Sequence, residues 1–169
     1  MGKFTESQNK DHWNQFAKKY KNIPTGASYD SNLVDLENYY IISKLKKLKS
    51  NSMLDIGCGN GQRTKLFSKY IKIKTTGIDY SENMIKQAKT LETKKLSFKN
   101  VNISDYSNSE KYDVIISCRC FINQTSTTNQ IKLFKKLYSM LNKHGHLIIA
   151  EASAEGLKNL NLLRKSFNL

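Results

Sequence analysis

The run MLDIGCGNG at positions 53–61 places three glycines at alternate positions directly after a short apolar segment. The apolar residues before the glycines are typical of a buried strand, and residues 62–71 have the apolar spacing of a helix. Glycines in such a strand-to-helix turn let a ligand approach the backbone, and the helix directs its first N–H groups at that ligand. The stretch therefore predicts a ligand-binding turn in an α/β fold.

The spacing of the glycines separates two classes of ligand. A dinucleotide-binding turn has the pattern GxGxxG, whose third glycine would stand where this chain has Gln62. The chain instead has GxGxG preceded by Asp55, and this run, DIGCGNG, resembles the first motif of the S-adenosylmethionine-dependent methyltransferases of Rossmann-like (class I) fold. The resemblance implies that Asp55, Gly57, Gly59 and Gly61 hold the methionine part of the cofactor.

An acidic residue, Asp79, ends the next strand-like run, TTGID at 75–79. Its two carboxylate oxygens suit the two hydroxyls of a ribose, and Ser81 is the expected N-cap of the following helix. The run GIDYSENMI also resembles the second motif of the same family. That likeness implies that Asp79 binds the ribose and that Tyr80 and Met84 flank the adenosine.

Two further strands are predicted, at 96–103 and 111–117, and the second has the continuous apolar run of a central parallel strand. The family commonly places an acid between them to receive the adenine amino group. Here the aligned residue is Asn102, whose side-chain carbonyl can still accept, with Asp105 as an alternative contact. The resemblance thus implies a cofactor site made of Asp55, Gly57, Cys58, Gly59, Gly61, Asp79, Tyr80, Met84, Asn102, Ile103 and Ser117.

Strand and helix alternate from residue 53 to residue 150, and the last pair is a predicted helix at 128–141 and a strand at 146–150. This pattern predicts an α/β fold with a doubly wound, mostly parallel sheet and helices on both faces. Right-handed crossovers then place the glycine turn between the first and fourth strands. The family usually adds a sixth strand and an antiparallel seventh, so this sheet is expected to lack the last one or two strands.

The length indicates one domain over residues 1–169. Its expected parts are an N-terminal helical lid at 1–50, a cofactor-binding core at 51–152 and a C-terminal helix at 153–169. Either the chain is a fragment, or a partner covers the unpaired fifth strand, for which a second copy of the chain is one candidate.

The composition limits the classes of partner that we expect. The net charge of +14 is compatible with nucleic-acid binding, but lysine supplies nearly all the positive charge, whereas bidentate phosphate and base recognition favours arginine. Nucleic acid is therefore an alternative that is not favoured over a small-molecule substrate. No apolar run is long enough to span a membrane and no signal segment begins the chain, so a cytoplasmic protein without a membrane partner is expected. The three cysteines and three histidines have no zinc spacing, and no metal is predicted.

The acceptor of the methyl group is expected over the carboxyl ends of the first, fourth and fifth strands. From their chemistry, Arg119 would neutralise an acidic substrate, Asn123 would orient a hydroxyl and Glu151 would act as general base. His12, on the expected lid, is a second candidate base. For the residues at the strand ends the alternative is a structural ion pair or cap, and for His12 it is a solvated side chain.

The sequence therefore predicts an S-adenosylmethionine-dependent enzyme that methylates a small molecule, which is sugar-related or another metabolite. One alternative is an RNA methyltransferase with the same cofactor site. The other is a truncated cofactor-binding subunit that has no activity of its own.

Overall fold

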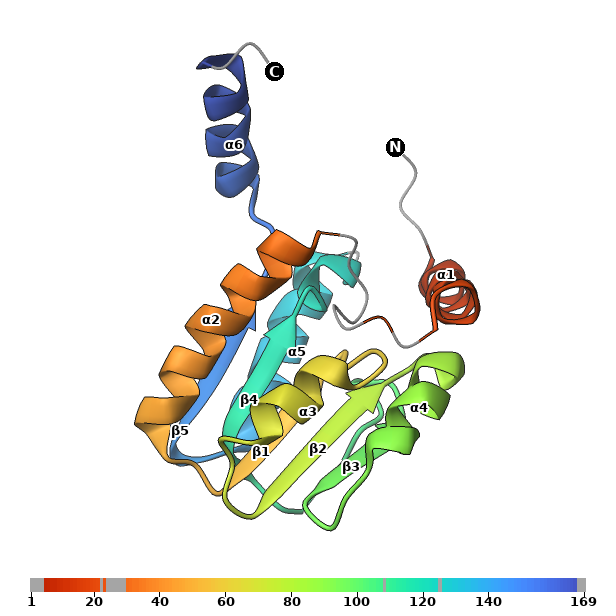
Figure 1. Ribbon diagram of the computed structural model, residues 1–169, viewed down its shortest axis with the longest axis vertical. Coiled ribbons are helices and arrows are strands. Elements are labelled where there is room, and N and C mark those ends of the chain that lie inside the picture. The colour runs from red at the N-terminus through yellow and green to blue at the C-terminus, as the bar shows by residue number, and fades with distance from the viewer. Residues whose placement is uncertain (1–4, 22, 24–29, 108, 125, 167–169) are drawn as a thin grey trace.

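A five-stranded parallel sheet with the order β3-β2-β1-β4-β5 forms the centre of the computed structural model (Figure 1). The structure describes residues 5–21, 23, 30–107, 109–124 and 126–166. The strands are β1 (Ser52–Ile56), β2 (Lys74–Asp79), β3 (Leu96–Asn100), β4 (Tyr112–Cys118) and β5 (Leu141–Ala150). The predicted α/β doubly wound fold is confirmed, and β1 and β4, where the strand order reverses, are neighbours as expected.

The described part of the chain also contains six α-helices and two 3₁₀ turns. They are α1 (Glu6–Lys19), α2 (Ser31–Leu48), α3 (Gln62–Ser68), α4 (Glu82–Ala88), η1 (Lys89–Leu91), η2 (Phe121–Asn123), α5 (Thr127–Ser139) and α6 (Ala154–Ser166). Of these, α2, α3 and α4 cover one face of the sheet and α5 covers the other, while α6 extends away from the sheet (Figure 1). None of the helices described is long and apolar enough to cross a membrane.

The alternation of side chains along the central strands fills the core on both faces of the sheet. On one face, Met53 of β1 and Val114 of β4 pack with Leu45 of α2 and Phe67 of α3. On the other face, one cluster contains Leu54, Ile56 and Ile115 from the strands and Leu133 and Leu137 from α5. Burial on both faces explains why β1 and β4 have continuous apolar runs.

Two glycines make room for the ring of Phe98 on β3. A Cβ at Gly77 of β2 would lie 2.6 Å from this ring, and a Cβ at Gly61 would lie 2.7 Å from it and 2.9 Å from Ala88. Gly61 also has a φ of +78°, which disfavours any side chain. These glycines let the glycine turn pack closely against β3 and α4, and this contact fixes the position of the turn.

The boundary between α5 and β5 differs from the prediction. The helix predicted at 128–141 ends at Ser139, and the strand predicted at 146–150 begins already at Leu141, so Gly145 lies inside β5. Strand pairing begins immediately after the helix because the Tyr112 N–H donates to the Met140 carbonyl. The register then shifts between Tyr112 and Val114, which accommodates the extra residues of β5 as a bulge.

Two other elements are shorter than predicted, and one connection lacks a helix. The helix predicted at 62–71 ends at Ser68, and the strand predicted at 96–103 ends at Asn100, because the N–H groups of Asp105 and Tyr106 turn back to the Asn102 carbonyl. No helix lies between β3 and β4 among the described residues, so the alternation of strand and helix is interrupted there.

The two N-terminal helices occupy different places. A capping box between Thr5 and Gln8 begins α1, which packs against α4 through a cluster of Trp13, Phe16 and Met84. By contrast, α2 lies on the sheet. Among the described residues of the predicted lid, only those of α1 border the cavity described below. Residues 1–4, 22 and 24–29 of the predicted segment lie outside the described part. The same holds for residues 167–169 of the predicted C-terminal helix.

Candidate functional site

A cavity of about 500 Å³ opens at the carboxyl ends of β1, β2 and β4 and is bordered by α1 and α5. Nine of the residues that the family resemblance implies for the cofactor line it. They are Asp55, Gly57, Cys58 and Gly59 from the glycine turn, Asp79, Tyr80 and Met84 from the second motif, and Asn102 and Ile103 after β3.

The glycine turn presents its backbone to the cavity. Gly57 and Gly59 have φ angles of +69° and +55°, and the N–H groups of Gly57 and Cys58 donate to the Ile78 carbonyl at 2.9 and 3.0 Å. A Cβ at Gly59 would meet only the Met84 sulfur, at 4.0 Å. The space in front of Gly59 is thus open, and a ligand can contact the backbone there, which fits the methionine part of S-adenosylmethionine.

Asp79 lies at the end of β2 with both carboxylate oxygens oriented by backbone groups. Its Oδ2 accepts the Gly59 N–H at 2.9 Å and its Oδ1 accepts the Ser81 N–H at 2.8 Å. Burial raises the pKa of Asp79 to about 6, although the N–H donors of Ser81, Gly59 and Tyr80 lower it. Each carboxylate oxygen can accept a second hydrogen bond, so the residue fits two ribose hydroxyls.

Asp55 lies at the end of β1, also buried. Its Oδ2 accepts the Thr64 hydroxyl at 2.6 Å. Burial raises the pKa of Asp55 to about 6, and the hydrogen bond from Thr64 and the charge of Arg63 oppose the rise. A carboxylate here would attract a ligand ammonium group.

The three thiols near the glycine turn are poor nucleophiles. Burial raises the pKa of Cys118 to about 12 and raises those of Cys58 and Cys120 well above the ordinary value. Because a thiolate is the reactive form, burial disfavours covalent chemistry at these side chains. In the described part of the chain no group of three or more His, Cys, Asp or Glu side chains could hold a metal ion.

Two of the residues predicted for catalysis line the cavity. Arg119 follows β4 with a φ of +57°, an unusual conformation for a residue with a side chain, and Asn123 donates from its Nδ2 to the Arg119 carbonyl at 3.1 Å. The other two do not line it. Glu151 accepts the N–H groups of Phe121 and Ile122 at 2.8 and 3.4 Å, and burial raises its pKa.

His12, the other residue outside the cavity wall, is exposed on α1 with its ring 5.0 Å from that of Trp13. Two predicted cofactor residues also lie off the wall. Gly61 packs on Phe98 as described above, and Ser117 is fully buried in β4 beside Ile56 of β1. The catalytic use of Glu151 and His12 and the cofactor contacts of Gly61 and Ser117 stay predictions.

Sequence reasoning missed several residues of the cavity wall. Lys132, Lys136 and Asn129 reach it from α5, and Arg63 reaches it from the first turn of α3. Periodicity alone does not show that α5 borders the site. Arg63 had a detectable signal, because it is one of three arginines in a lysine-rich chain and follows the glycines by two positions.

Comparison with known families and proteins gives matches to methyltransferases. A family model described as a methyltransferase domain matches residues 47–168. The 235L protein of Invertebrate iridescent virus 6, which carries a provisional methyltransferase name, is 32% identical over 122 residues, covering 68% of this chain and 46% of the relative. The malonyl-acyl-carrier-protein O-methyltransferase of Priestia megaterium is 36% identical over 103 residues, covering 59% of this chain and 36% of the relative. The chain thus spans less than half the length of each of these two relatives.

Among solved structures, the fold is similar to that of the plantazolicin methyltransferase BpumL in complex with a pentazolic desmethylPZN analogue and S-adenosylhomocysteine. The TM-score is 0.68 and the identity 24%, with 89% of this chain and 62% of that chain covered.

Proposed function

Because this chain belongs to the S-adenosylmethionine-dependent methyltransferases of class I, Rossmann-like fold, we propose that it transfers a methyl group from this cofactor to a small-molecule acceptor. The observation that carries the proposal is the cavity in which the open backbone at Gly59 lies beside the carboxylate of Asp79. That pair offers one contact surface for the methionine part and one for the ribose.

The remaining contacts follow from the same arrangement. Gly57, Cys58 and Gly59 would lie along the methionine part, with Asp55 near its ammonium group. Val101 and Ile103 on the loop after β3 provide apolar surface for the adenine, and Asn102 beside them carries an amide that can pair with its polar edge. Trp13 of α1 borders the cavity and would shield the bound cofactor from water.

The cofactor supplies a methyl group that is already activated on a sulfonium. What the chain has to do is align the acceptor in line with that group and receive its proton. We expect Asn123 to orient the acceptor, because it lines the cavity and its amide is held by the hydrogen bond that it donates to the Arg119 carbonyl. Glu151 stabilises the same segment by accepting two of its N–H groups, and its use as a base remains a prediction.

The polar side chains of the cavity lining favour an acceptor with acidic character. Arg119, Lys132 and Lys136 line the cavity, and Asn123 and Asn129 add amides. Cations attract a carboxylate or phosphate, and amides bind hydroxyls. Metabolites that carry hydroxyls together with a carboxylate or phosphate, such as acidic sugars, are therefore the first acceptors to test. The Priestia megaterium relative is itself named for a malonyl group.

Calorimetry with S-adenosylmethionine and S-adenosylhomocysteine tests the proposal. The unmodified chain should bind both ligands, and Asp79→Asn, which keeps the shape of the side chain but loses its charge, should weaken binding at least about tenfold. Asp35→Asn on the exposed side of α2 is the matched control and should bind as the parent does. A folded chain that binds neither ligand contradicts the proposal, whereas a binding chain is taken on to turnover with acidic metabolites.

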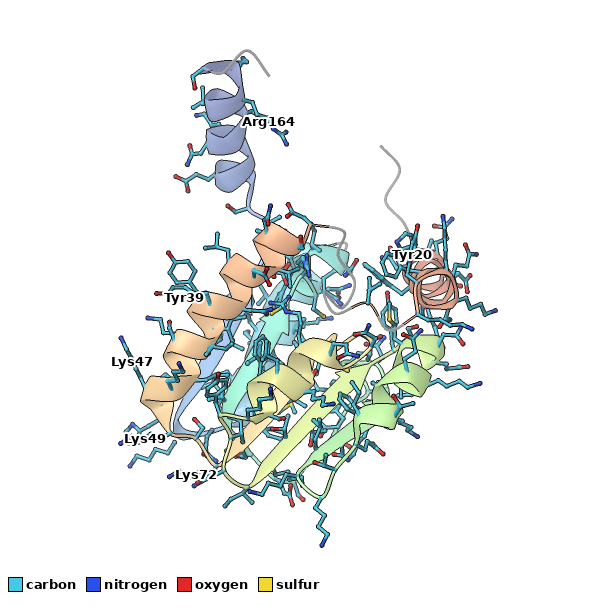
Figure 2. All side chains as sticks on the ribbon, in the orientation of Figure 1. Tyr20, Tyr39, Lys47, Lys49, Lys72 and Arg164 are labelled. Carbon is cyan, nitrogen blue, oxygen red and sulfur yellow. The ribbon has the colours of Figure 1, made fainter. Side chains whose placement is uncertain are left out.

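The RNA alternative has one observation in its favour, the net charge of +14. Figure 2 shows Lys47, Lys49 and Lys72 at the end of the sheet where β1 and β2 begin, whereas the cavity lies where these strands end. This separation favours a small acceptor. RNA affinity that falls steeply with salt, together with RNA methylation, would favour the alternative.

The second alternative, a subunit that binds cofactor without activity of its own, makes a different prediction. Such a chain would bind S-adenosylhomocysteine yet show no turnover with any acceptor until a partner is added. Mass in solution and turnover, measured on the same sample, separate it from an active enzyme.

A further inference from the structure

Exposed lysines stand where every strand of the sheet begins. Because the five strands are parallel, their amino ends lie along one edge of the sheet, and the cavity lies at the other ends of the strands. We call the surface at the amino ends the strand-entry face. Its exposed lysines, which lie shortly before β1 to β4 and in the bulge at the start of β5, are Lys49, Lys72, Lys94, Lys95, Lys111 and Lys143. Figure 2 shows Lys49 and Lys72 together at this end of the molecule.

Hydrogen bonds join the turns of the strand-entry face to one another. The Lys72 N–H donates to the Ser50 carbonyl at 3.1 Å, and the Lys95 Nζ donates to the Lys72 carbonyl at 2.9 Å. On the other side, Asp113 of β4 accepts the Asn51 N–H at 2.8 Å. The lysines of neighbouring strands are therefore held on one connected surface.

The acids near this face are already used within the chain. Glu110 pairs with Lys74, and Asp113 accepts three hydrogen-bond donors. Glu92 accepts the Phe98 N–H at 2.8 Å. Among the described residues, none of the six lysines of the strand-entry face forms an ion pair with an acid. The face therefore carries positive charge that an external anionic surface can neutralise.

Helix dipoles account for other lysines near this end, but not for most of this face. Lys46 and Lys47 lie in the last turn of α2, where a cation stabilises the carboxyl end of the helix. Lys49, which caps α2, shares this role in part. The other five lysines of the strand-entry face lie outside the helices, and the effect of a helix dipole is confined to its last turn.

Ile73 adds an apolar group among these lysines. Its side chain is 64% exposed, and it lies between Lys72 and Lys74 in the turn before β2. The large aromatic side chains that are exposed in the described chain lie instead on α2 and α5, and all three arginines lie outside the face. Nucleic-acid binding favours arginines and stacking aromatic rings. Lysines around an exposed aliphatic side chain suit the boundary between the headgroups and acyl chains of an anionic membrane.

We propose that the strand-entry face docks the chain on an anionic membrane surface, with its lysines at the lipid headgroups and Ile73 at the acyl boundary. A contact of this kind needs no helix that spans the membrane. Because the cavity lies at the opposite ends of the strands, it stays open to water and to dissolved acceptors in the docked chain. The docking does not depend on the proposed function, since no cavity residue takes part in it.

Sedimentation with lipid vesicles tests this docking. The chain should bind vesicles of about 30% phosphatidylserine in phosphatidylcholine but not vesicles of phosphatidylcholine alone, and binding should weaken as salt is added. Each lysine near such a surface strengthens binding about fivefold, so Lys72→Gln/Lys94→Gln/Lys111→Gln should lower the partition constant about 100-fold. Ile73→Asn should lower it about tenfold, because the apolar contact is lost.

The matched control is Lys18→Gln/Lys86→Gln/Lys135→Gln, which removes the same charge from exposed positions on α1, α4 and α5. It should change the partition constant by less than about threefold, since those lysines lie away from the face. Both triple variants should unfold in urea at the midpoint of the parent, so that a loss of docking is not a loss of folding. Equal losses in the two triple variants, or no binding to the phosphatidylserine vesicles, would overturn the proposal. Binding of a single-stranded RNA in place of the vesicles would assign the face to nucleic acid and overturn it as well.

Discussion

At the scale of single residues, Gly59 and Gly77 are required for different reasons, and substitution by alanine separates them. A methyl group at Gly59 points into the open cavity with a φ of +55°, whereas one at Gly77 would lie 2.6 Å from the Phe98 ring. Gly59→Ala should cost about 1–2 kcal/mol from backbone strain and weaken S-adenosylhomocysteine binding at least about tenfold. Gly77→Ala should cost about 1–3 kcal/mol of stability from overpacking. Urea unfolding and calorimetry on both variants check this, and equal affinity of Gly59→Ala and the parent would contradict it.

The buried acids Asp55 and Asp79 make stability depend on pH in an unusual direction. Burial raises both pKa values to about 6 from 3.8, so between these values the folded chain binds more protons than the unfolded chain. Their contribution to the free energy of unfolding therefore increases by about 1 kcal/mol for each acid as the pH falls from 7 to 5. The same contribution is lost as the pH rises through 6. Urea unfolding at pH 7 and pH 5 should show that acidification raises the free energy of unfolding more for the parent than for the double variant Asp55→Asn/Asp79→Asn. An equal pH response of the two proteins would be evidence against the raised pKa values.

The raised pKa of Asp79 also predicts weaker cofactor binding at low pH. The ribose hydroxyls need the ionised form of Asp79 as acceptor, and protonation below about pH 6 removes that form. The affinity for S-adenosylhomocysteine should be constant above pH 7 and fall about tenfold by pH 5. Calorimetry across this range measures it, and the unfolding experiment above shows that the chain is still folded. Affinity that is flat down to pH 5 would contradict the assignment.

Residues of the site could be predicted from sequence where a local motif fixes their direction. Asp55, Gly59 and Asp79 stand in strand-to-helix turns, and such a turn alone directs them to the carboxyl end of the sheet. Arg63 and Lys132 could not be assigned in this way. Arg63 lies on α3 and Lys132 on α5, and their approach to the cavity depends on how these helices pack, whereas helical periodicity gives the buried face of a helix but not its neighbours.

At the scale of elements, Asp113 connects three segments at the amino ends of the strands. Its Oδ2 accepts the N–H groups of Asn51 and Ser52 at 2.8 and 3.2 Å, and its Oδ1 accepts the Asn142 side chain at 2.6 Å. Burial alone would raise the pKa of Asp113, but these hydrogen bonds lower it overall. The carboxylate therefore holds the start of β1 and the bulged part of β5 against β4.

Asp113→Asn should lower the free energy of unfolding by about 1 kcal/mol, because the neutral amide loses charge-assisted hydrogen bonds in a partly exposed place. Asp105→Asn, in the exposed turn after β3, is the control and should change stability by less than about 0.5 kcal/mol. Because the pKa of Asp113 is lowered, its contribution is present above the ordinary value of 3.8 and is lost as the pH falls through that region. Equal stability of the two variants at neutral pH would show that the hydrogen bonds to Asp113 do not contribute to stability.

Element types were easier to predict from sequence than element ends. The buried strands β1 and β4 and the helix α5 have strong periodicity or continuous apolar runs, and all three exist near the expected positions. The start of β5 was wrong because a glycine after a helix is normally a cap signal. In the structure, pairing between Tyr112 and Met140 extends the sheet to the end of the helix, and only the tertiary contact determines this.

At the scale of the whole molecule, the sheet ends at β5, and no strand of the described chain pairs with its outer edge. The backbone groups along that edge are a template for pairing with another strand. The same edge carries Ile149, which is 36% exposed, and α6 leads away from the sheet without covering it (Figure 1). The family resemblance predicted this open edge, because no sixth or seventh strand was expected in this sequence, and no strand follows β5 among the described residues.

We therefore expect the chain to associate with itself through β5. The mass measured by light scattering should rise above 19.4 kDa as the concentration increases, because a second copy offers the same unpaired edge. Ile149→Lys places a charge at this edge and should shift the mass back towards the monomer. Ile73→Lys, at an equally apolar and more exposed position before β2, should not. S-adenosylhomocysteine affinity should be the same in all three proteins, since neither isoleucine lines the cavity. A monomer at every concentration would contradict pairing between copies through this edge.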